Sequence, residues 1–261
     1  MLVLQLNMRR TSRQSAFARL CRPTVRLAIL AVAATLTLTG CQAVISSAPE
    51  AQVRVIHATP DTPGLDIYQG PNALAFNLDF GAVTSYIPLT PGTYTINADT
   101  AGSKQILSSA KATFAASTQY TVLLGNSTAN LQQLTLTDQN QPAPAGQVAL
   151  RFVNQAIRSG AVDIYLVPAG QKLSAVAPLV TGNAFGTNTG YINVPAGTSS
   201  LIMLPAGTVP MSSAVASYTG PQITYSSGSA RTIILIDQTV VTAAGLKVIT
   251  AEDFDPPGSA N

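Results

Sequence analysis

The stretch Arg54–His57, RVIH, decides how the chain is divided, because it recurs 97 residues later as Arg151–Asn154, RFVN. The triplet Asp66–Tyr68 recurs at the same offset as Asp163–Tyr165. Three further matches follow in the same order: Phe80-Gly81 with Phe185-Gly186, Tyr86-Ile87 with Tyr191-Ile192, and Gly92-Thr93 with Gly197-Thr198. Ordered self-similarity of this kind is the signature of a repeated structural unit. The sequence therefore predicts two copies of one module.

The offset between the copies grows along the chain. Residues 121–124, TVLL, match residues 233–236, IILI, at offset 112, so the second copy has gained insertions without any change of order. The longest insertion, within Val167–Asn183, is rich in Ala, Pro and Gly and is expected to be a surface loop. The copies meet at Asp138–Gly146, DQNQPAPAG, whose Pro-x-Pro spacing stiffens a linker. We expect a short, semi-rigid hinge there.

Inside each copy the hydrophobic pattern indicates β-strands. Thr93–Ile96 and Lys111–Phe114 alternate polar and apolar residues, which is the period of a half-buried strand. The run Ile233–Ile236 is apolar throughout and predicts a central strand. Turn-forming pairs recur every 8 to 12 residues, as in sandwiches and barrels. We predict an all-β fold of two tandem immunoglobulin-like/transthyretin-like β-sandwich modules, at 51–138 and 147–255, with a linker at 139–146 and a disordered tail at 256–261.

The apolar stretch Leu27–Cys41, LAILAVAATLTLTGC, separates these modules from a basic leader. Its 14 uncharged residues before the cysteine are fewer than the roughly 20 that a membrane-spanning helix needs. They suit the apolar region of a secretory signal, which follows a positively charged segment. Residues 1–26 supply that segment, with six arginines and no acidic residue.

The end of this stretch, Leu38–Cys41 or LTGC, resembles the bacterial lipobox, in which the cysteine receives a palmitate-type lipid and becomes the new N-terminus. We therefore expect a signal peptide at 1–40, lipidation of Cys41 and a tether at 41–50. Gln42, rather than Asp, follows the cysteine, which in the usual Gram-negative sorting rule indicates the outer membrane. The alternative is an ordinary cleaved signal whose cysteine is incidental.

Removal of the leader reverses the charge of the chain. The whole sequence has a formal net charge of +3, but six of its 14 basic residues lie in the leader and all 11 acidic residues lie after it, which leaves the mature chain near −3. The remaining cations are scattered singly, whereas a nucleic-acid-binding surface needs a basic cluster. We expect no nucleic-acid partner. Cys21 leaves with the signal, so no pair of cysteines remains for a disulfide and stability must come from an apolar core.

His57 is the sole histidine of the sequence. A His-rich metal site is thereby excluded, and a catalytic triad would need a positioned nucleophile and an orienting carboxylate. The simplest interpretation is a histidine at a strand end, hydrogen-bonded to a neighbouring turn. Because Asp61 and Asp66 are close in sequence, a ligand-binding site for a glycan or calcium in this loop is the alternative. No catalytic residue, metal site or cofactor is expected.

Two sets of carboxylates admit both structural and calcium-binding interpretations. Asp66 and Asp163 begin equivalent strands, where a carboxylate often accepts hydrogen bonds from turn amides. Glu252, Asp253 and Asp255 offer the oxygen ligands that calcium prefers, but no Gly-anchored loop accompanies them. We expect the last three to form a solvated C-terminal segment.

The tyrosines that match between the copies are expected to be core or corner residues rather than ligand platforms; they are Tyr68 with Tyr165 and Tyr86 with Tyr191. The chain has no Trp, the largest aromatic face for a sugar. This weakens a carbohydrate-binding interpretation without removing it.

The residues of the repeat also carry a resemblance to a family: Val53–Asp61, Leu65–Tyr68, Phe80-Gly81, Tyr86 and Pro91–Tyr94 resemble the domain of unknown function 4397. Its members are β-rich modules of bacterial envelope and secreted proteins, often in tandem. The resemblance extends over residues 51–138. The second copy departs from it, because Asn154 replaces the histidine and residues 155–158 read QAIR in place of ATPD. The family implies the fold and the compartment but no established activity.

These observations predict a non-catalytic cell-envelope lipoprotein with a structural, adhesive or binding role. Its partners would be the membrane, through Cys41, and an envelope protein or glycan. A hydrolase that uses carboxylates alone is the third hypothesis, since Asp61, Asp66, Asp79 and Asp99 could converge in the first module.

Overall fold

The computed structural model describes residues 49–211, 214–239 and 245–256. The expected signal peptide, Cys41, most of the tether and residues 257–261 lie outside the described residues. All of these described residues belong to one compact unit. In the described part of the chain, no helix is long and apolar enough to cross a membrane.

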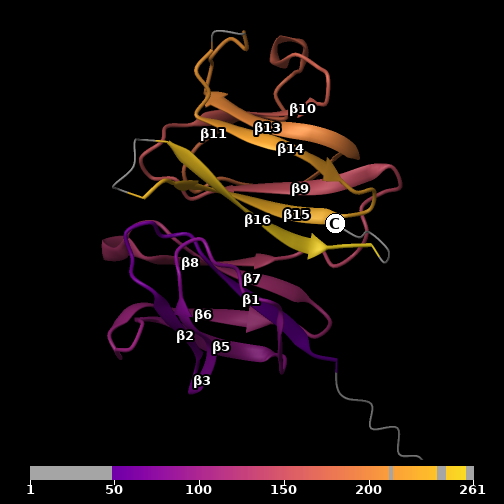
Figure 1. Ribbon diagram of the computed structural model, residues 1–261. Coiled ribbons are helices and arrows are strands. Elements are labelled where there is room, and N and C mark those ends of the chain that lie inside the picture. The colour runs from indigo at the N-terminus through magenta and orange to yellow at the C-terminus, as the bar shows by residue number, and fades with distance from the viewer. Residues whose placement is uncertain (1–48, 212–213, 240–244, 257–261) are drawn as a thin grey trace, which may run out of the picture. The chain divides into compact units, whose positions relative to one another are not determined.

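The first module consists of two four-stranded sheets (Figure 1). Its elements are β1 Ala51–His57, β2 Leu65–Gln69, β3 Asn72–Leu78, β4 Ile87–Leu89, β5 Gly92–Thr100, β6 Ile106–Phe114, β7 Gln119–Gly125, the 3-10 turn η1 Thr128–Asn130 and β8 Gln132–Thr137. One sheet has the order β4-β1-β7-β8 and the other β3-β2-β5-β6. Strands β1 and β7 are parallel, and the other paired strands of the module are antiparallel.

The second module repeats this topology. Its elements are β9 Gln147–Asn154, β10 Val162–Pro168, the 3-10 turn η2 Leu173–Ala175, β11 Val180–Asn183, β12 Asn188–Pro195, β13 Gly197–Pro205, β14 Tyr218–Tyr225, β15 Ala230–Asp237 and β16 Leu246–Phe254. The sheets have the orders β12-β9-β15-β16 and β11-β10-β13-β14, with β9 and β15 parallel. The predicted all-β fold of two β-sandwich modules is confirmed.

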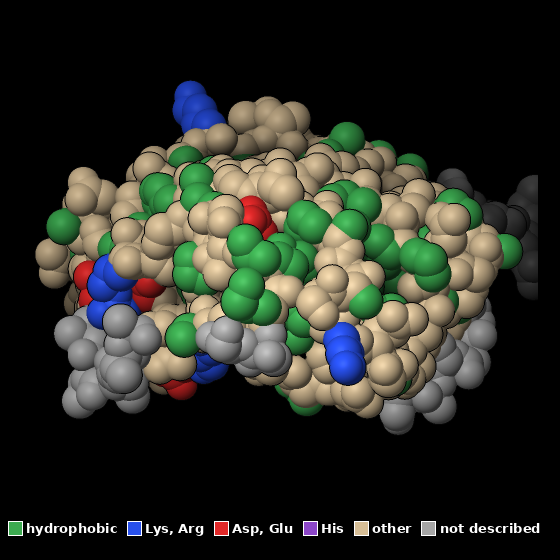
Figure 2. Space-filling model, turned by 90° about the horizontal axis from the view of Figure 1, so that it is seen from above, with side chains coloured by type: hydrophobic (Ala, Val, Ile, Leu, Met, Phe, Trp, Pro, Cys, Tyr) green, Lys and Arg blue, Asp and Glu red, His purple; other side chains and the backbone are tan. Residues whose placement is uncertain are grey.

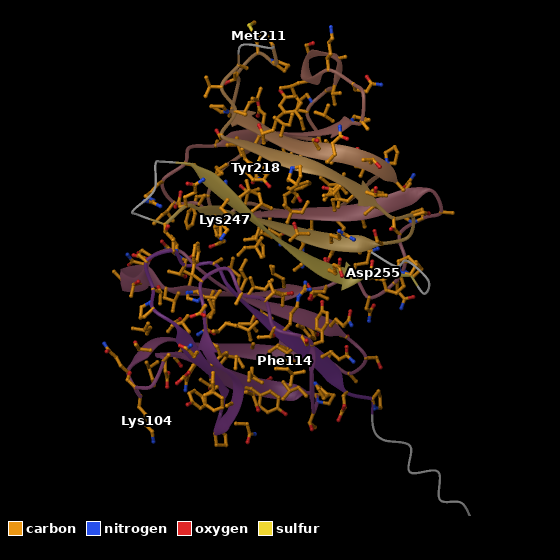
Figure 3. All side chains as sticks on the ribbon, in the orientation of Figure 1. Lys104, Phe114, Met211, Tyr218, Lys247 and Asp255 are labelled. Carbon is orange, nitrogen blue, oxygen red and sulfur yellow. The ribbon has the colours of Figure 1, made fainter. Side chains whose placement is uncertain are left out.

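Each module has its own apolar core between its two sheets. Val53 and Val122 face Ile67 and Ile96 in the first module, and Phe114 closes the core (Figure 3). The second module packs Leu150, Phe152, Ile164, Met203 and Ile233 in the same way. All eight residues of β15 are buried, as expected for a parallel central strand that is covered on both faces. The prediction of a central strand at Ile233–Ile236 is confirmed.

The opposite faces of the two inner sheets pack against each other. Because successive side chains of a strand point to opposite faces, Ile56 and Leu123 point away from the first core. They meet Val153, Ile234 and Ile249 of the second module in a third apolar cluster. The described residues thus form four sheet layers, and Figure 1 shows the outer sheets β3-β2-β5-β6 and β11-β10-β13-β14 at opposite ends of the stack.

The strand register corrects the sequence alignment of the copies by one residue. Arg54 lies opposite Thr121, and Arg151 lies opposite Thr232. Thr121 therefore corresponds to Thr232, at offset 111, and the match of residues 121–124 with 233–236 was wrong. A strand that is apolar on both faces carries no alternation to fix its register, and a shift of one residue exchanges its faces.

Two expectations about irregular segments were also wrong. The insertion within Val167–Asn183 contains η2 and β11, because Val180 pairs with Ile164 at the edge of the outer sheet. The acidic segment from Glu252 is not a solvated terminus: Asp253 lies in β16 and is buried. A buried carboxylate needs a partner of opposite charge.

Candidate functional site

Four charged side chains lie buried where the inner sheets meet: Arg54 on β1, Asp138 after β8, Arg151 on β9 and Asp253 on β16. The arginine side chains are 3% exposed and the aspartates 0%. Arg54 Nη2 donates to Asp253 Oδ1, and Arg151 Nη2 donates to Asp138 Oδ1 at 2.5 Å. Each module therefore supplies the arginine that pairs with the aspartate of the other module.

Each aspartate is held in place by hydroxyl groups of its own module. Thr121 Oγ1 and Tyr86 Oη donate to Asp138 Oδ2 at 2.6 and 2.8 Å. The second module repeats this arrangement with Thr232, Tyr191 and Asp253, at 2.7 and 2.8 Å. The two halves of the network are related as the two copies of the repeat are.

The remaining donors of the arginines are also engaged. Arg54 Nε donates to Thr121 Oγ1 at 2.8 Å, and its Nη1 donates to the backbone carbonyl of Glu252 at 2.6 Å. Arg151 makes the equivalent bonds to Thr232 Oγ1 and to the carbonyl of Thr137, both at 2.9 Å. The guanidinium groups of Arg54 and Arg151 lie 4.8 and 4.7 Å from the ring centroids of Tyr86 and Tyr191, within cation–π range.

Burial sets the protonation of the groups in this network. It raises the pKa of Tyr86 and of Tyr191 far above the ordinary value, and the charge of the nearby aspartate adds to the effect in each case. Both phenols therefore stay protonated and can donate. Burial also raises the pKa of Asp253, while the charge of Arg54 acts in the opposite direction.

A groove of about 660 Å³ opens beside the network, between the modules. It is lined by Arg54, Val83, Thr84, Ser85 and Tyr86 of the first module and by Ile223, Arg231, Thr250, Ala251 and Glu252 of the second. Its volume lies within the range of small-molecule sites, about 300–1,000 Å³. The lining combines apolar surface, hydroxyl groups and one ion pair.

Arg231 is the unusual member of this lining. It is 7% exposed, yet its Nε and Nη2 have no hydrogen-bond partner among the described residues. Glu252 Oε1 lies 3.3 Å from Nη2 and supplies a countercharge, and the Tyr225 ring centroid lies 6.0 Å from the guanidinium carbon. A buried donor without a partner costs about 1–3 kcal/mol, and more when it is charged.

The structure places His57 inside the first module, with a ring that is 0% exposed. Nδ1 lies 2.9 Å from the carbonyl oxygen of Leu78 and donates to it, while Nε2 is buried without a hydrogen-bond partner among the described residues. Burial lowers the pKa of His57, so the ring is neutral. His57 ends β1, as expected, but its hydrogen bond goes to the last residue of strand β3 and not to a turn.

Asp61 and Asp66 each hold a turn. Asp61 Oδ1 accepts from the amide of Thr128 at 3.1 Å. Asp66 accepts from the amides of Asn77 and Gly102 at 2.8 and 3.0 Å, and Asp163 does the same in the second module with Gly182 and Gly207. The expected role of Asp66 and Asp163 as acceptors for turn amides is confirmed. A ligand-binding role for His57, Asp61 and Asp66 stays a prediction.

In the part of the chain that the structure describes, no group of three or more His, Cys, Asp or Glu side chains could hold a metal ion. The network itself was missed in the sequence, although half of its signal was visible. Arg54 with Arg151, and Tyr86 with Tyr191, match between the copies; Asp138 and Asp253 were assigned to a linker and to a tail.

No curated protein matches the chain. Three solved structures show weak likeness. An alpha-glucan-binding streptococcal virulence factor is 10% identical over 70% of this chain and 92% of that chain, with a TM-score of 0.22. A family CBM26 module of Eubacterium rectale Amy13K in complex with maltoheptaose is 11% identical over 80% of this chain and 98% of that chain, with a TM-score of 0.21, and the Bacillus anthracis TIE protein is 9% identical over 78% of this chain and 44% of that chain, with a TM-score of 0.23. At these TM-scores the likenesses carry no argument about the site. Residues 51–165 match the family described as Domain of unknown function (DUF4397), which confirms the resemblance found in the first module and extends it into β10.

Proposed function

We propose that this chain is a non-catalytic, lipid-anchored protein of the cell envelope whose two modules act as one rigid binding unit. The observation that carries the proposal is the reciprocal pairing of Arg54 with Asp253 and of Arg151 with Asp138. Separating the modules would leave four buried charges without partners, and breaking even one buried pair costs about 3–5 kcal/mol. In this respect the proposal departs from the expectation of a hinge.

The linker supports the same proposal. The amide of Ala143 donates to the carbonyl of Gly228, and the amide of Gly146 donates to Ser227 Oγ. The amide of Gln139 donates to Tyr191 Oη at 3.1 Å. The segment between the modules is thus attached to the second module at three points. We expect this attachment to prevent a hinge motion between the modules.

The non-catalytic part of the proposal rests on how the titratable groups are used. A general base must reach the proton that it removes, within hydrogen-bond distance of the substrate. The ring of His57 is buried, the carboxylate of Asp66 accepts from two backbone amides, and Asp138 and Asp253 are enclosed in the network. These groups serve the fold, so we assign function to the exposed surfaces and the groove.

Membrane attachment rests on the sequence alone. The ten residues of the tether, 41–50, would reach at most about 35 Å when fully extended, which keeps the two modules close to the bilayer. Labelled palmitate should enter the wild-type protein and the control Cys21→Ser, but not Cys41→Ser, and membrane fractionation should follow the label. Label that persists in Cys41→Ser would contradict the proposal.

A further inference from the structure

We infer that the groove between the modules binds a neutral, hydroxyl-rich ligand: a sugar residue within a larger glycan. The inference rests on the proposed binding function and names its site and its class of ligand. The groove is concave, lies between two modules that are joined by a buried network, and has a volume of about 660 Å³. Small-molecule sites are commonly preformed hollows of this size.

Arg231 supplies the first recognition element. The residue is more than nine-tenths buried and lines the groove, and its Nε and Nη2 make no hydrogen bond to the described residues. Nη2 also forms an ion pair with Glu252 Oε1 at 3.3 Å, so the carboxylate lies beside the fork. The two N–H groups of an arginine edge form a planar fork that suits two adjacent oxygen acceptors. Neighbouring hydroxyl oxygens of a sugar ring present such acceptors.

The charges around the groove favour a neutral ligand over an anion. Arg54 is paired with Asp253, and Arg231 already lies 3.3 Å from the carboxylate of Glu252. Burial, and next the charge of Glu252, raise the pKa of Asp255 nearby, which indicates crowding of negative charge. An added anion would face these carboxylates, whereas a hydroxyl group can accept from Arg231 and donate to Glu252 at once.

The remaining lining suits the two kinds of surface on a sugar. Val83 and Ile223 present apolar atoms, and the C–H face of a pyranose ring can pack on them. Ser85 and Thr250 are exposed and supply hydroxyl groups at the same groove. A few placed polar groups on an otherwise apolar wall are the usual composition of a specific small-molecule site.

The site belongs to one side of the interface only. In the first module the position of Arg231 is taken by Tyr120, which lies opposite Thr137 as Arg231 lies opposite Glu252. Tyr120 is part of the first core and accepts a hydrogen bond from the amide of Ala115. The pseudo-symmetric side therefore has neither the arginine fork nor the carboxylate, and we expect one site per chain.

The test uses the full chain in a polyoxyethylene detergent, because sugar-based detergents would compete. The probes are immobilised neutral oligosaccharides of glucose, galactose, mannose and N-acetylglucosamine, an oligomer of galacturonic acid, and inorganic phosphate. We expect at least one neutral oligosaccharide to bind, and Arg231→Gln to raise its Kd at least tenfold. The matched control is Arg158→Gln, which removes an exposed arginine that is ion-paired with Asp237 away from the groove.

A second variant, Arg231→Lys, keeps the charge but removes the fork and should also lose at least tenfold. Thermal melting of each variant separates lost binding from lost folding. The inference is wrong if no neutral oligosaccharide binds, or if folded Arg231→Gln and Arg231→Lys bind as well as the wild type. Binding of phosphate or galacturonate alone through Arg231 would show an anion site and also overturn it. Each of these outcomes is separate from palmitate labelling, which tests the anchor without involving the groove.

Discussion

The two modules are alike where they meet and different where they face outward. On the outer sheet of the first module, Tyr68 lies opposite Asn97, and Asp66 lies opposite Asp99. The equivalent pairs of the second module are Tyr165 with Ile202, and Asp163 with Leu204. Two polar side chains have thus been exchanged for aliphatic ones on the same face of the same sheet.

The insertions of the second module explain this exchange. Leu173 and Val176, after β10, and Ala214 and Ala216, before β14, pack on Tyr165 in a separate apolar cluster. Figure 2 looks onto the molecule from this covered side, and Figure 3 shows Met211 of the second covering segment at its outermost point. Tyr165 is 2% exposed as a result.

The first module has no such cover in the described residues. Phe76 is 69% exposed and meets the ring of Tyr68 edge-on at 6.0 Å, and Ser109 Oγ donates to Asn97 Oδ1 on the open face. The inner face that both copies share keeps its residues, because each copy must complete the network of the other. The outer face of a copy is free to change with its loops.

The largest expected effect tests the likeness of the inner faces. Arg54→Leu and Arg151→Leu should each lower the free energy of unfolding by about 3–5 kcal/mol, because each leaves a buried aspartate without its partner. Urea denaturation measures both. The two values should agree within about 1 kcal/mol if the halves of the network are equivalent. A cost below about 1 kcal/mol for either variant would show that the two buried ion pairs are not equivalent.

The next effect tests the difference between the outer faces. Tyr165→Ala should lower the free energy of unfolding by about 3 kcal/mol or more, because it leaves a cavity under the covering loops. Tyr68→Ala, at the equivalent but half-buried position, should cost about 1 kcal/mol or less. Thermal melting of the two variants provides the measurement. Equal costs would show that the loops do not cover the second module in solution.

A smaller effect concerns His57, whose place is taken by Asn154 in the second module. The folded-state pKa of His57 lies below 6.5, so the unfolded chain binds its proton more readily. This contribution to stability is fully present above pH 6.5 and is lost as the pH falls through the lowered folded-state pKa. His57→Asn should lower the free energy of unfolding by about 0.5–3 kcal/mol at pH 7.5. It should also make that free energy depend less on pH below pH 6.5. An unchanged pH dependence in chemical denaturation would contradict this assignment.

Much of the fold could be predicted because strand period and repeat order are local signals. Thr93–Ile96 alternates and Ile233–Ile236 does not, and the structure uses them as a half-buried and a central strand. The cover over Tyr165 could not be predicted in the same way. Leu173 and Val176 are isolated among Ala, Pro and Gly, so they carry no periodicity that distinguishes a packed segment from a loop.

Half of the buried network could be predicted because its arginines and tyrosines repeat in the sequence. Arg54 and Tyr86 reappear as Arg151 and Tyr191, which marks them as shared, but their partners come from the other module across the interface. Asp253 lies 115 residues after Asp138, whereas Thr232 lies 111 residues after Thr121, so the longer connection between the last two strands of the second module hides the equivalence of the two aspartates. The groove arises only when the two inner sheets dock, so no local pattern indicates it.

The smallest expected effect concerns one pair of opposed residues on the outer sheet of the first module. Asp66 and Asp99 lie directly opposite each other, and both are buried, whereas Asp163 faces Leu204. Like charges at opposed positions destabilise a sheet by about 0.2–1 kcal/mol. Asp99 Oδ1 has no hydrogen-bond partner among the described residues, and burial, followed by the charge of Asp66, raises the pKa of Asp99. The folded chain therefore holds this proton more tightly than the unfolded chain, so stability declines as the pH rises from the unfolded-state pKa near 4 through the raised folded-state pKa.

Asp99→Asn should stabilise the protein by up to about 1 kcal/mol at pH 7 and by less below pH 4. Urea denaturation at both pH values checks the sign, with Asp61→Asn, an exposed carboxylate, as the control. Destabilisation by Asp99→Asn at pH 7 would mean that the carboxylate has a favourable partner, and that the first module gains from the acid that the second has replaced by leucine.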